Sequence, residues 1–407
     1  MPPSALLPLL VVLLGAPVSG QAAPKRAKPE PAPAPVERLS TPAGRGSMAP
    51  RLSGSGDAPL LSWVEPAGEG HRLLVSRLAL DGWSEPVVAA EGSGWFVNWA
   101  DTPGVVQAPD GRLWAHWLAR AGEAPYAYHV MTAWSGDGGV TWSSERALHD
   151  DVSSTEHGFV SAAASVDALA AVWLDGRGME AGGPMTLRSR VVGPRGPSGA
   201  EVVIDDRTCD CCPTSVASTS VGLIAAWRDR SEDEIRDIAV ARRLDGTWEA
   251  PRIVAPDGWR MPGCPVNGPT IVSNGRKSVV LVWFTAEGEQ ARVQVATSQD
   301  AGETFDGRGV VSRQTLGRVT ASAFPEGGAA IAWIEKGAEG EPSLTAARVE
   351  SDGSVGGSVR VVAMSSARRS GMPRALTLTD GKVLFAWTDV FGDTTRVRTA
   401  RVELPRP

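Results

Sequence analysis

The chain has 407 residues, and its composition joins many turn-forming residues to one repeatedly used aromatic, with Gly 46, Pro 31 and Trp 15 against Tyr 2. This mixture favours short strands and many turns over helices. A formal net charge of -6 provides no basic surface for nucleic acid or an anionic membrane, so we expect neither partner.

The first 35 residues divide into two predicted segments. Residues 1–22 are typical of a signal peptide, because an apolar run too short to span a bilayer ends at Gly15 and small residues follow it. Residues 23–35 are rich in Pro, Ala and Lys and predict a disordered linker. We therefore expect a secreted or periplasmic protein without a membrane span, with a single folded domain over residues 36–405.

Seven segments of this domain share a short apolar run that ends in Trp and is followed by a polar turn. These residues, spaced 50 to 56 apart, are Trp63, Trp117, Trp173, Trp227, Trp283, Trp333 and Trp387. Three further short strands surround each Trp, and four strands per repeat is the unit of a propeller blade. The sequence predicts an all-β propeller of seven four-stranded blades, with each Trp packed between neighbouring blades.

The two ends of the repeat region predict how the ring closes. The last repeat has only three strands and ends at Leu404. Residues 36–52 resemble residues 359–376, which run from the outer strand of one blade into the inner strand of the next. The N-terminal segment is therefore predicted to supply the missing outer strand of blade seven, which pairs two otherwise open sheet edges.

Two turns, at residues 135–142 and 298–305, read S-x-D-x-G-x-T-W/F. The Asp accepts hydrogen bonds from turn amides, and the Gly supplies a positive φ. This motif is similar to the Asp-box of the sialidase (BNR-repeat) superfamily. Most of the chain resembles bacterial sialidase-like proteins labelled exo-alpha-sialidase, through residues 98–101, 155–159, 173–177, 209–212, 227–237 and 263–269.

The resemblance implies a sialidase-type propeller with six blades, which is the alternative to the seven blades counted from the repeats. It also implies a glycoside hydrolase that acts on glycans. Sialidases use an Asp acid/base, three arginines and a Tyr nucleophile late in the chain. Here the only tyrosines are Tyr126 and Tyr128, in the second repeat, and an early motif is reduced to residues 50–52. The absence of a late Tyr keeps open a non-catalytic module, for interaction or metal handling, with a degenerate site.

In a four-stranded blade, the connections between blades and the turns after the second strand emerge on one face, and the unusual segments fall there. The arginines on this face, which suit a carboxylate or another anion but could also brace neighbouring turns, are Arg51, Arg177, Arg228, Arg230, Arg318 and Arg374. Asp101, Glu156 and Glu234 are candidate acid/base carboxylates, any of which could equally be structural. His157 and Asn267 complete the candidate ligand-binding set, with His157 suited to proton transfer, metal binding or bracing a turn.

All four cysteines, Cys209, Cys211, Cys212 and Cys264, lie in two consecutive connections on the same face. In an exported protein they suggest two disulfides. Because Cys211 and Cys212 are adjacent, at least one bridge to Cys264 is expected, which would tie blades four and five. A thiolate cluster for Cu(I) or Zn(II), the only cofactor that the sequence suggests, and a reactive thiol are the alternatives.

The leading hypothesis is an exported sialidase-like propeller, expected to be monomeric, that binds glycans or other small anionic ligands at the Arg-rich face. Hydrolysis of the bound glycan is its enzymatic form, and the non-catalytic module is the alternative. The sequence does not choose between them, because fold alone does not determine function.

Overall fold

The computed structural model describes residues 35–165, 168–193, 195–337 and 340–407. The predicted signal peptide at 1–22 and the predicted linker up to residue 34 lie outside these ranges. Among the described residues, no helix has the length and apolar character needed to cross a membrane. The helical content of the described residues is three 3-10 turns, η1 (Met179–Ala181), η2 (Glu287–Glu289) and η3 (Arg368–Ser370).

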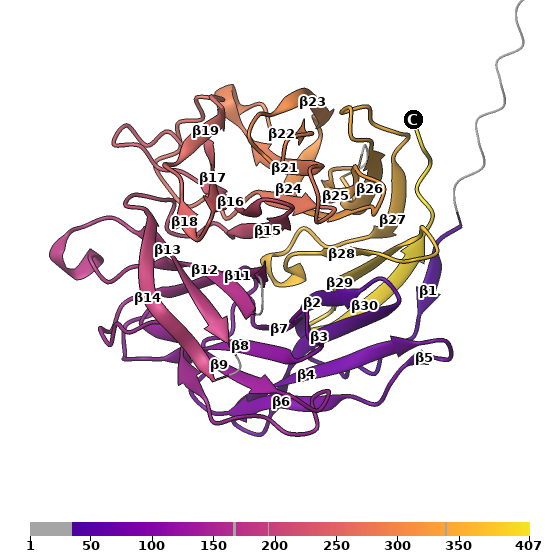
Figure 1. Cartoon of the computed structure of the whole chain (residues 1–407). Helices are drawn as coiled ribbons and strands as arrows, with labels where there is room; N and C mark the ends of the chain where they lie inside the picture. The colour runs from indigo at the N-terminus through magenta and orange to yellow at the C-terminus, as the bar shows by residue number, and fades with distance from the viewer. Residues whose placement is uncertain (1–34, 166–167, 194, 338–339) are drawn as a thin grey trace, which may run out of the picture. The chain divides into compact units, whose positions relative to one another are not determined.

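The strands form seven separate antiparallel sheets, which are the blades of a β-propeller (Figure 1). The first blade contains β2 (Met48–Ser55), β3 (Ala58–Ala67), β4 (Gly70–Ala79), β5 (Gly82–Trp83) and β6 (Val87–Gly92). The second contains β7 (Gly104–Gln107), β8 (Leu113–Arg120), β9 (Tyr128–Ser135) and β10 (Arg146–Ala147). The third contains β11 (His157–Ser165), β12 (Ala168–Asp175), β13 (Thr186–Gly193) and β14 (Gly196–Asp205).

The remaining four blades repeat this order. The fourth contains β15 (Ser215–Thr219), β16 (Gly222–Arg228), β17 (Ile238–Leu244), β18 (Thr247–Trp248) and β19 (Arg252–Ala255). The fifth contains β20 (Thr270–Ser273), β21 (Val279–Thr285), β22 (Arg292–Ser298) and β23 (Asp306–Ser312). The sixth contains β24 (Thr315–Ala323), β25 (Ala329–Glu335), β26 (Ser343–Val349) and β27 (Val359–Ala363). The seventh contains β28 (Arg374–Thr377), β29 (Val383–Phe391), β30 (Thr394–Val402) and, from the other end of the chain, β1 (Glu37–Leu39).

The count of seven blades confirms the prediction from the Trp spacing, and the six-bladed alternative is wrong for this chain. In blades one and four the outer position is divided between two short strands that both pair with the third strand. The predicted closure is also confirmed, because β1 pairs with β30 in the register Glu37 to Arg401. In Figure 1 the indigo β1 accordingly lies beside the yellow β30.

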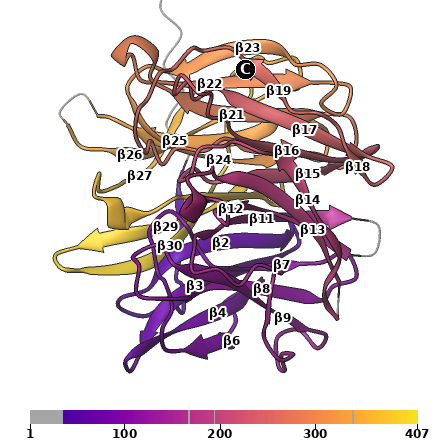
Figure 2. The same cartoon turned by 90° about the vertical axis from the view of Figure 1, so that its left-hand side faces the viewer.

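The innermost strands lie around the axis of the ring. β2 contacts β7 and β28, β15 contacts β11 and β20, and β24 contacts β20 and β28. Figure 1 shows β2, β11, β15, β24 and β28 near the centre, with β6, β14 and β23 toward the outside. In the turned view of Figure 2, β6 and β23 lie at opposite ends. The innermost strands therefore hold the connections that precede them around one axial mouth.

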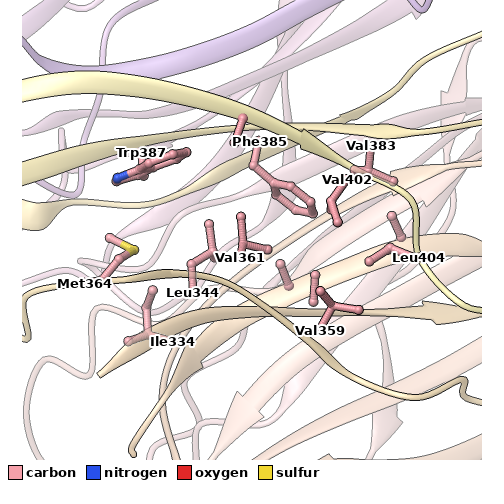
Figure 3. Packing of buried hydrophobic residues seen from close by; sticks show 14 of the residues in the cluster. Ile334, Leu344, Val359, Val361, Met364, Val383, Phe385, Trp387, Val402 and Leu404 are labelled. Atoms are coloured by element: carbon pink, nitrogen blue, oxygen red, sulfur yellow. The ribbon is translucent and has the colours of Figure 1, made fainter. Parts of the chain in front are cut away.

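The repeated Trp residues are buried in the apolar layers between blades, as predicted. Trp387 of blade seven packs against Ile334, Leu344 and Met364 of blade six (Figure 3). Trp173 and Trp283 likewise lie in clusters shared with the preceding blade. A buried Trp removes about 150–250 Å² of surface from water, so these layers hold the ring together.

The two Asp-box turns have the predicted local geometry. The Asp137 carboxylate accepts a hydrogen bond from Thr141 N at 2.9 Å and another from Thr141 Oγ1 at 2.6 Å. Asp300 repeats both contacts with Thr304 at the same distances. The hydroxyl and amide hydrogen bonds to Asp137 lower the pKa of its carboxyl to about 2. The propeller architecture agrees with the sialidase resemblance at the level of fold.

Candidate functional site

A cavity of about 250 Å³ opens at the axial mouth, and it is lined by strand residues of six blades and by the connection before the second blade. Five of the residues predicted from the sequence contribute to this lining. They are Arg51, Asp101, Asn267, Arg318 and Arg374. The other predicted ligand-binding and acid/base residues, Glu156, His157, Arg177, Arg228, Arg230 and Glu234, are not among the lining residues.

Arg51 and Arg374 are two arginines of the cavity wall. Arg374 donates a hydrogen bond from Nη2 to Thr102 Oγ1 at 3.0 Å. Within the described ranges no carboxylate pairs with either guanidinium. Burial lowers the pKa of Arg374 to about 10. Burial, together with the charge of Arg374, lowers the pKa of Arg51 to about 9. An anion bound here would relieve both the desolvation and the mutual repulsion of the two cations.

The backbone beside Arg51 is shaped to admit this side chain. A Cβ atom added to Gly104, at the start of β7, would lie on the Cδ atom of Arg51. Glycine at this position therefore gives the Arg51 side chain its path across the blade boundary.

Arg318 also lines the cavity, but its guanidinium is already occupied. Nη1 donates to Ser370 Oγ at 2.7 Å and to Ala367 O at 3.2 Å, and the group lies 4.9 Å from the ring centre of Trp99. Its backbone N donates to Asn267 Oδ1 at 2.7 Å. Arg318 and Asn267 therefore brace the wall of the cavity between blades five, six and seven.

Asp101 belongs to a buried group of three titratable residues beside the cavity. The Tyr128 hydroxyl lies 2.7 Å from Glu156 Oε1 and 3.1 Å from Asp101 Oδ2. Burial raises the pKa of Asp101 to about 7. Burial, with a smaller contribution from the charge of Asp101, raises the pKa of Glu156 to about 8. A phenol has one proton and cannot donate to both carboxylates, so the group is best satisfied when one carboxyl is protonated.

The sequence reasoning named Asp101 and Glu156 but missed Tyr128. Burial and the two neighbouring carboxylates raise the pKa of Tyr128, which keeps the phenol protonated in the unliganded protein. The sequence did carry a signal, because Tyr128 is one of only two tyrosines in the chain. Tyr128 begins β9 in blade two, and Glu156 directly precedes β11 in the neighbouring blade three.

Strained backbone holds this group in place. Phe159 has a φ of 53° at a bulge in β11, which lets its N donate to Asp101 Oδ1 at 2.8 Å. A Cβ at Gly158 would overlap Asp101 Oδ2. β2 and β24 have similar bulges, with positive φ at Ala49 and Arg318. Bulges and unfavourable φ values concentrate at functional sites, where they re-aim side chains.

The remaining predicted arginines are braced in the rim around the cavity. Arg177 pairs with Asp175 at 2.7 Å and with Glu201 at 2.6 Å. Arg230 pairs with Glu234 at 2.8 Å. Hydrogen bonds from Arg230, and then from Arg236, lower the pKa of Glu234 and keep this carboxylate ionised. Glu234 is therefore poorly suited to donate a proton.

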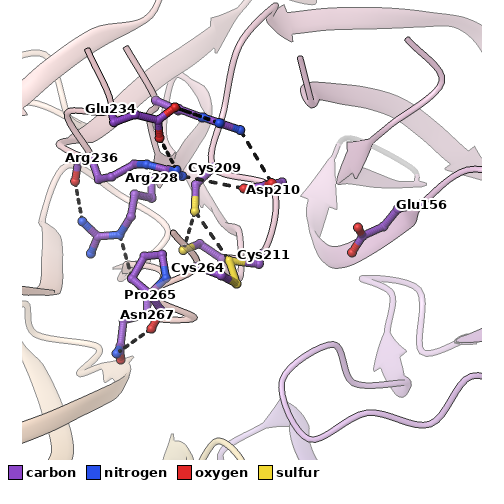
Figure 4. The surroundings of a disulfide bond; sticks show 12 residues. Glu156, Cys209, Asp210, Cys211, Arg228, Glu234, Arg236, Cys264, Pro265 and Asn267 are labelled. Atoms are coloured by element: carbon purple, nitrogen blue, oxygen red, sulfur yellow. Dashed lines mark hydrogen bonds and ion pairs between the residues drawn. A yellow bond between two sulfur atoms is a disulfide. The ribbon is translucent and has the colours of Figure 1, made fainter. Parts of the chain in front are cut away.

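Arg228 is buried in the rim without a carboxylate ion pair among the described residues. Its Nη1, Nη2 and Nε atoms donate to the carbonyls of Arg236, Phe284 and Asn267 at 2.5, 2.5 and 2.9 Å. The guanidinium also lies 4.9 Å from the ring centre of Trp259. These contacts give Arg228 a structural position between blades four and five (Figure 4).

His157 lies in a second titratable cluster, away from the cavity lining. Ring nitrogens of His129, His149 and His157 lie within 4.8 Å of one another, so the three could hold a metal ion. However, His157 and His149 stack in parallel at 3.9 Å, and His157 Nε2 already lies 3.0 Å from Asp151 Oδ2. These contacts favour a structural role in which His157 braces blades two and three.

The cysteines occupy one place on the same face, as predicted. Cys211 and Cys264 form a disulfide, which confirms the expected bridge between the connections that precede blades four and five. The prediction of a second disulfide is wrong, because Cys209 and Cys212 are free and buried, with their Sγ atoms 2.8 Å apart. Sγ atoms of Cys209, Cys211 and Cys212 lie close enough together to hold a metal ion, but Cys211 is used by the disulfide.

No protein-family model matches this chain. No curated protein matches it either. Among solved structures, the BP39L lectin from Burkholderia pseudomallei is similar, with a TM-score of 0.57 and 16% identity over 85% of this chain and 94% of the lectin. The polysaccharide lyase Uly1 has a TM-score of 0.54 and 12% identity over 88% of this chain and 90% of the lyase. A protein of unknown function from Dyadobacter fermentans has a TM-score of 0.54 and 13% identity over 91% of this chain and 98% of its own. These identities show the fold alone.

Proposed function

We propose that the axial cavity binds the carboxylate of an acidic glycan, with Arg51 and Arg374 as the anion-binding groups. The observation that carries this proposal is the pair of guanidiniums, which line the axial cavity and lack carboxylate partners in the described part of the chain. Arg is suited to this task because its planar donors match a carboxylate. The lectin and the polysaccharide lyase with this fold make a glycan the preferred ligand class.

The size of the cavity favours one terminal sugar residue as the bound group. Its volume of about 250 Å³ lies just below the roughly 300–1,000 Å³ usual for small-molecule pockets. A terminal acidic sugar places a carboxylate and several hydroxyls in such a space, where Thr102 and Asn267 supply neutral polar atoms.

Calorimetric titration with a sialylated trisaccharide, a uronic-acid disaccharide and neutral lactose tests the binding proposal. We expect an acidic sugar to bind and lactose not to bind. Arg51→Gln and Arg374→Gln should each weaken binding by about 30-fold or more, since losing a desolvated charge contact costs about 2 kcal/mol or more. Arg230→Gln is the matched control. Binding that is absent for every acidic sugar, or unaffected in both cavity variants, would contradict the proposal.

The Asp101, Tyr128 and Glu156 group favours hydrolysis of the bound glycan as a second candidate function. Asp101 lines the cavity, and a carboxyl with a pKa of about 7 can donate a proton to a leaving group near neutral pH. Tyr128 and Glu156 would then hold Asp101 and adjust its proton affinity.

A fluorogenic sialoside and a panel of uronic-acid glycosides test hydrolysis separately from binding. We expect turnover to fall by at least about 100-fold in Asp101→Asn, the loss typical of a missing general acid. Tyr128→Phe should shift the pH profile, because it removes the phenol from the shared hydrogen bond. If wild-type protein binds an acidic glycan but turns over no glycoside, the chain is a binding module.

We also propose that the protein is exported after removal of residues 1–22. The support is the short apolar run and the small residues that follow it. Expression of the full chain in a bacterial host, followed by mass measurement of the periplasmic fraction, should give a product that starts close to residue 23.

A further inference from the structure

The four cysteines form a compact site beside the cavity, with one accessible end and one buried end. Cys264 is exposed and Cys211 is half-buried, whereas Cys209 and Cys212 are each 1% exposed. Cys209 Sγ lies 4.0 Å from Cys211 Sγ and 2.8 Å from Cys212 Sγ. Figure 4 shows Cys209 beside the disulfide between Cys211 and Cys264.

The distance between the two free thiols is short for atoms that are not bonded. Non-bonded heavy atoms prefer separations of roughly 3.5–4.0 Å, and a disulfide bond is about 2.05 Å long. At 2.8 Å, the Sγ atoms of Cys209 and Cys212 are closer than a non-bonded pair normally lies. A small side-chain movement would therefore suffice to join them.

The surroundings of the two thiols differ in a way that selects Cys209 as the nucleophile. Burial alone would raise the pKa of Cys209, but the Cys212 thiol, the Cys211 amide and the charges of Arg228 and Arg236 lower it to about 7. Burial and the neighbouring Cys209 raise the pKa of Cys212. Arg236 is itself buried and pairs with Glu234 at 2.6 Å, and within the described residues its Nε has no hydrogen-bond partner. The thiolate is the reactive form of cysteine, so this environment prepares Cys209 for attack.

We propose that the four cysteines are a thiol–disulfide exchange site, in which the buried Cys209 and Cys212 dithiol reduces the Cys211–Cys264 disulfide. This activity is independent of the glycan site. Its external substrates are low-molecular-weight disulfides, which reach the site at the exposed Cys264.

The first step moves the bond inward. The Cys209 thiolate attacks Sγ of Cys211 and forms the Cys209–Cys211 bond, while the Cys211–Cys264 bond breaks. Cys264 leaves as a thiolate at the surface and takes a proton from water.

The second step closes the buried pair. Cys212 loses its proton and attacks Sγ of Cys209, and Cys211 leaves as a thiolate that is then protonated. In total, two electrons and two protons pass from Cys209 and Cys212 to Cys211 and Cys264. The internal exchange conserves the number of disulfides and requires no outside oxidant.

The accessible dithiol can then reduce a small disulfide. Cys264 attacks the small disulfide and releases one thiol, and Cys211 attacks the resulting mixed disulfide and releases the second thiol. The Cys211–Cys264 bond is restored, the substrate is reduced to two thiols, and Cys209 and Cys212 retain the disulfide. Two molecules of a second small thiol then reduce the accessible Cys211–Cys264 bond and become one disulfide, and the reverse internal exchange returns Cys209 and Cys212 to the dithiol. The net reaction passes two electrons from this thiol to the small disulfide.

Alkylation of the wild-type protein without added reductant tests the exchange. N-ethylmaleimide is added to folded protein that contains one disulfide, and peptides are mapped by mass spectrometry over time. We expect Cys264 to become alkylated while the Cys209–Cys212 disulfide accumulates in equal amount. In Cys209→Ser, which lacks the nucleophile, alkylation of Cys264 should slow by at least 100-fold. Cys212→Ser, the matched variant at the other thiol, should lose the Cys209–Cys212 product but keep the attacking residue.

Equilibration with reduced and oxidised glutathione gives a second measurement that needs no variant. Molecules with one disulfide should contain both the Cys211–Cys264 and the Cys209–Cys212 isomers. The proposal would be overturned if Cys211–Cys264 were the only bridge at every glutathione ratio and Cys264 stayed unreactive in wild-type protein. Stoichiometric zinc or copper that protects Cys209 and Cys212 from alkylation would also overturn it, in favour of a metal site.

Discussion

The cavity and the rim around it use the same residue type in opposite ways. Arg51 and Arg374 in the cavity have desolvated charges and no carboxylate partner within the described residues. Arg177 and Arg230 in the rim are neutralised by carboxylates at 2.6 to 2.8 Å. A count of arginines on a face is therefore a poor guide to a ligand site, because the partner of each charge decides whether it is free to bind.

The largest expected effect is on stability, at the most deeply braced rim residue. Arg228→Met removes three donors and leaves the carbonyls of Asn267, Arg236 and Phe284 without them. Unsatisfied buried acceptors cost about 1–3 kcal/mol each, so the free energy of unfolding should fall by about 3 kcal/mol or more. Urea denaturation monitored by Trp fluorescence measures this. A decrease in the free energy of unfolding below about 1 kcal/mol would show that these three hydrogen bonds of Arg228 do not stabilise the fold.

The next effect concerns the dependence of stability on pH at the cavity wall. The pKa of Asp101 in the folded protein is raised to about 7, so the folded state binds more protons than the unfolded state from about pH 4 to pH 7. The stability that this proton contributes is complete below pH 4 and is lost as pH rises through 7. Relative to Asp101→Asn, the wild type should lose about 2 kcal/mol between pH 5 and pH 8.

Asp137 in the first Asp-box is the matched control for that measurement. Its pKa is lowered to about 2, so its contribution has the opposite sign and is lost as the solution becomes more acidic. Asp137→Asn should therefore lower stability at neutral pH and leave the slope between pH 5 and pH 8 unchanged. Equal slopes for wild type and Asp101→Asn would show that Asp101 titrates normally.

A smaller effect is expected where the cavity is shaped by the absence of a side chain. Gly104→Ala places a Cβ on the path of Arg51 and should displace its guanidinium without touching the ligand. The affinity for the acidic glycan should fall about tenfold, which corresponds to about 1.4 kcal/mol. Gly193→Ala, where the added Cβ meets nothing within 4 Å and φ is not positive, as at Gly104, is the matched control. Unchanged affinity in Gly104→Ala would mean that Arg51 is not held by this path.

The fold could be predicted from the sequence because its signals are local and repeated. Each Trp marks the end of a blade's second strand, and the Asp-box turns carry their geometry within eight residues. The closing strand could also be predicted locally, since residues 36–52 resemble residues 359–376, which lead into blade seven. The Cys211–Cys264 bridge followed from two neighbouring connections in the same way.

The division of the arginines could not be predicted, because it depends on contacts between distant segments. Arg374 reaches Thr102 across the ring closure, and Arg51 crosses Gly104 of the next blade. Tyr128 was missed for the same reason. Its hydroxyl contacts Asp101 and Glu156, which come from segments distant in the sequence. Local sequence patterns specify which loops share a face but not which side chains pair there.

The smallest effect should come from the rim pair of Arg230 and Glu234, whose side chains are 27% and 25% exposed. Partly exposed ion pairs contribute about 0.2–1 kcal/mol, so Arg230→Gln and Glu234→Gln should each change the free energy of unfolding by less than about 1 kcal/mol. The double variant measures their coupling, which should fall when salt is raised because both groups are reached by solvent. Neither substitution should change the affinity for an acidic glycan by more than about twofold, since Asp210 and Glu234 already neutralise Arg230. A tenfold loss of affinity in Arg230→Gln alone would instead extend the ligand site from the cavity to the rim, because only a direct contact would make this paired residue as important as Arg374.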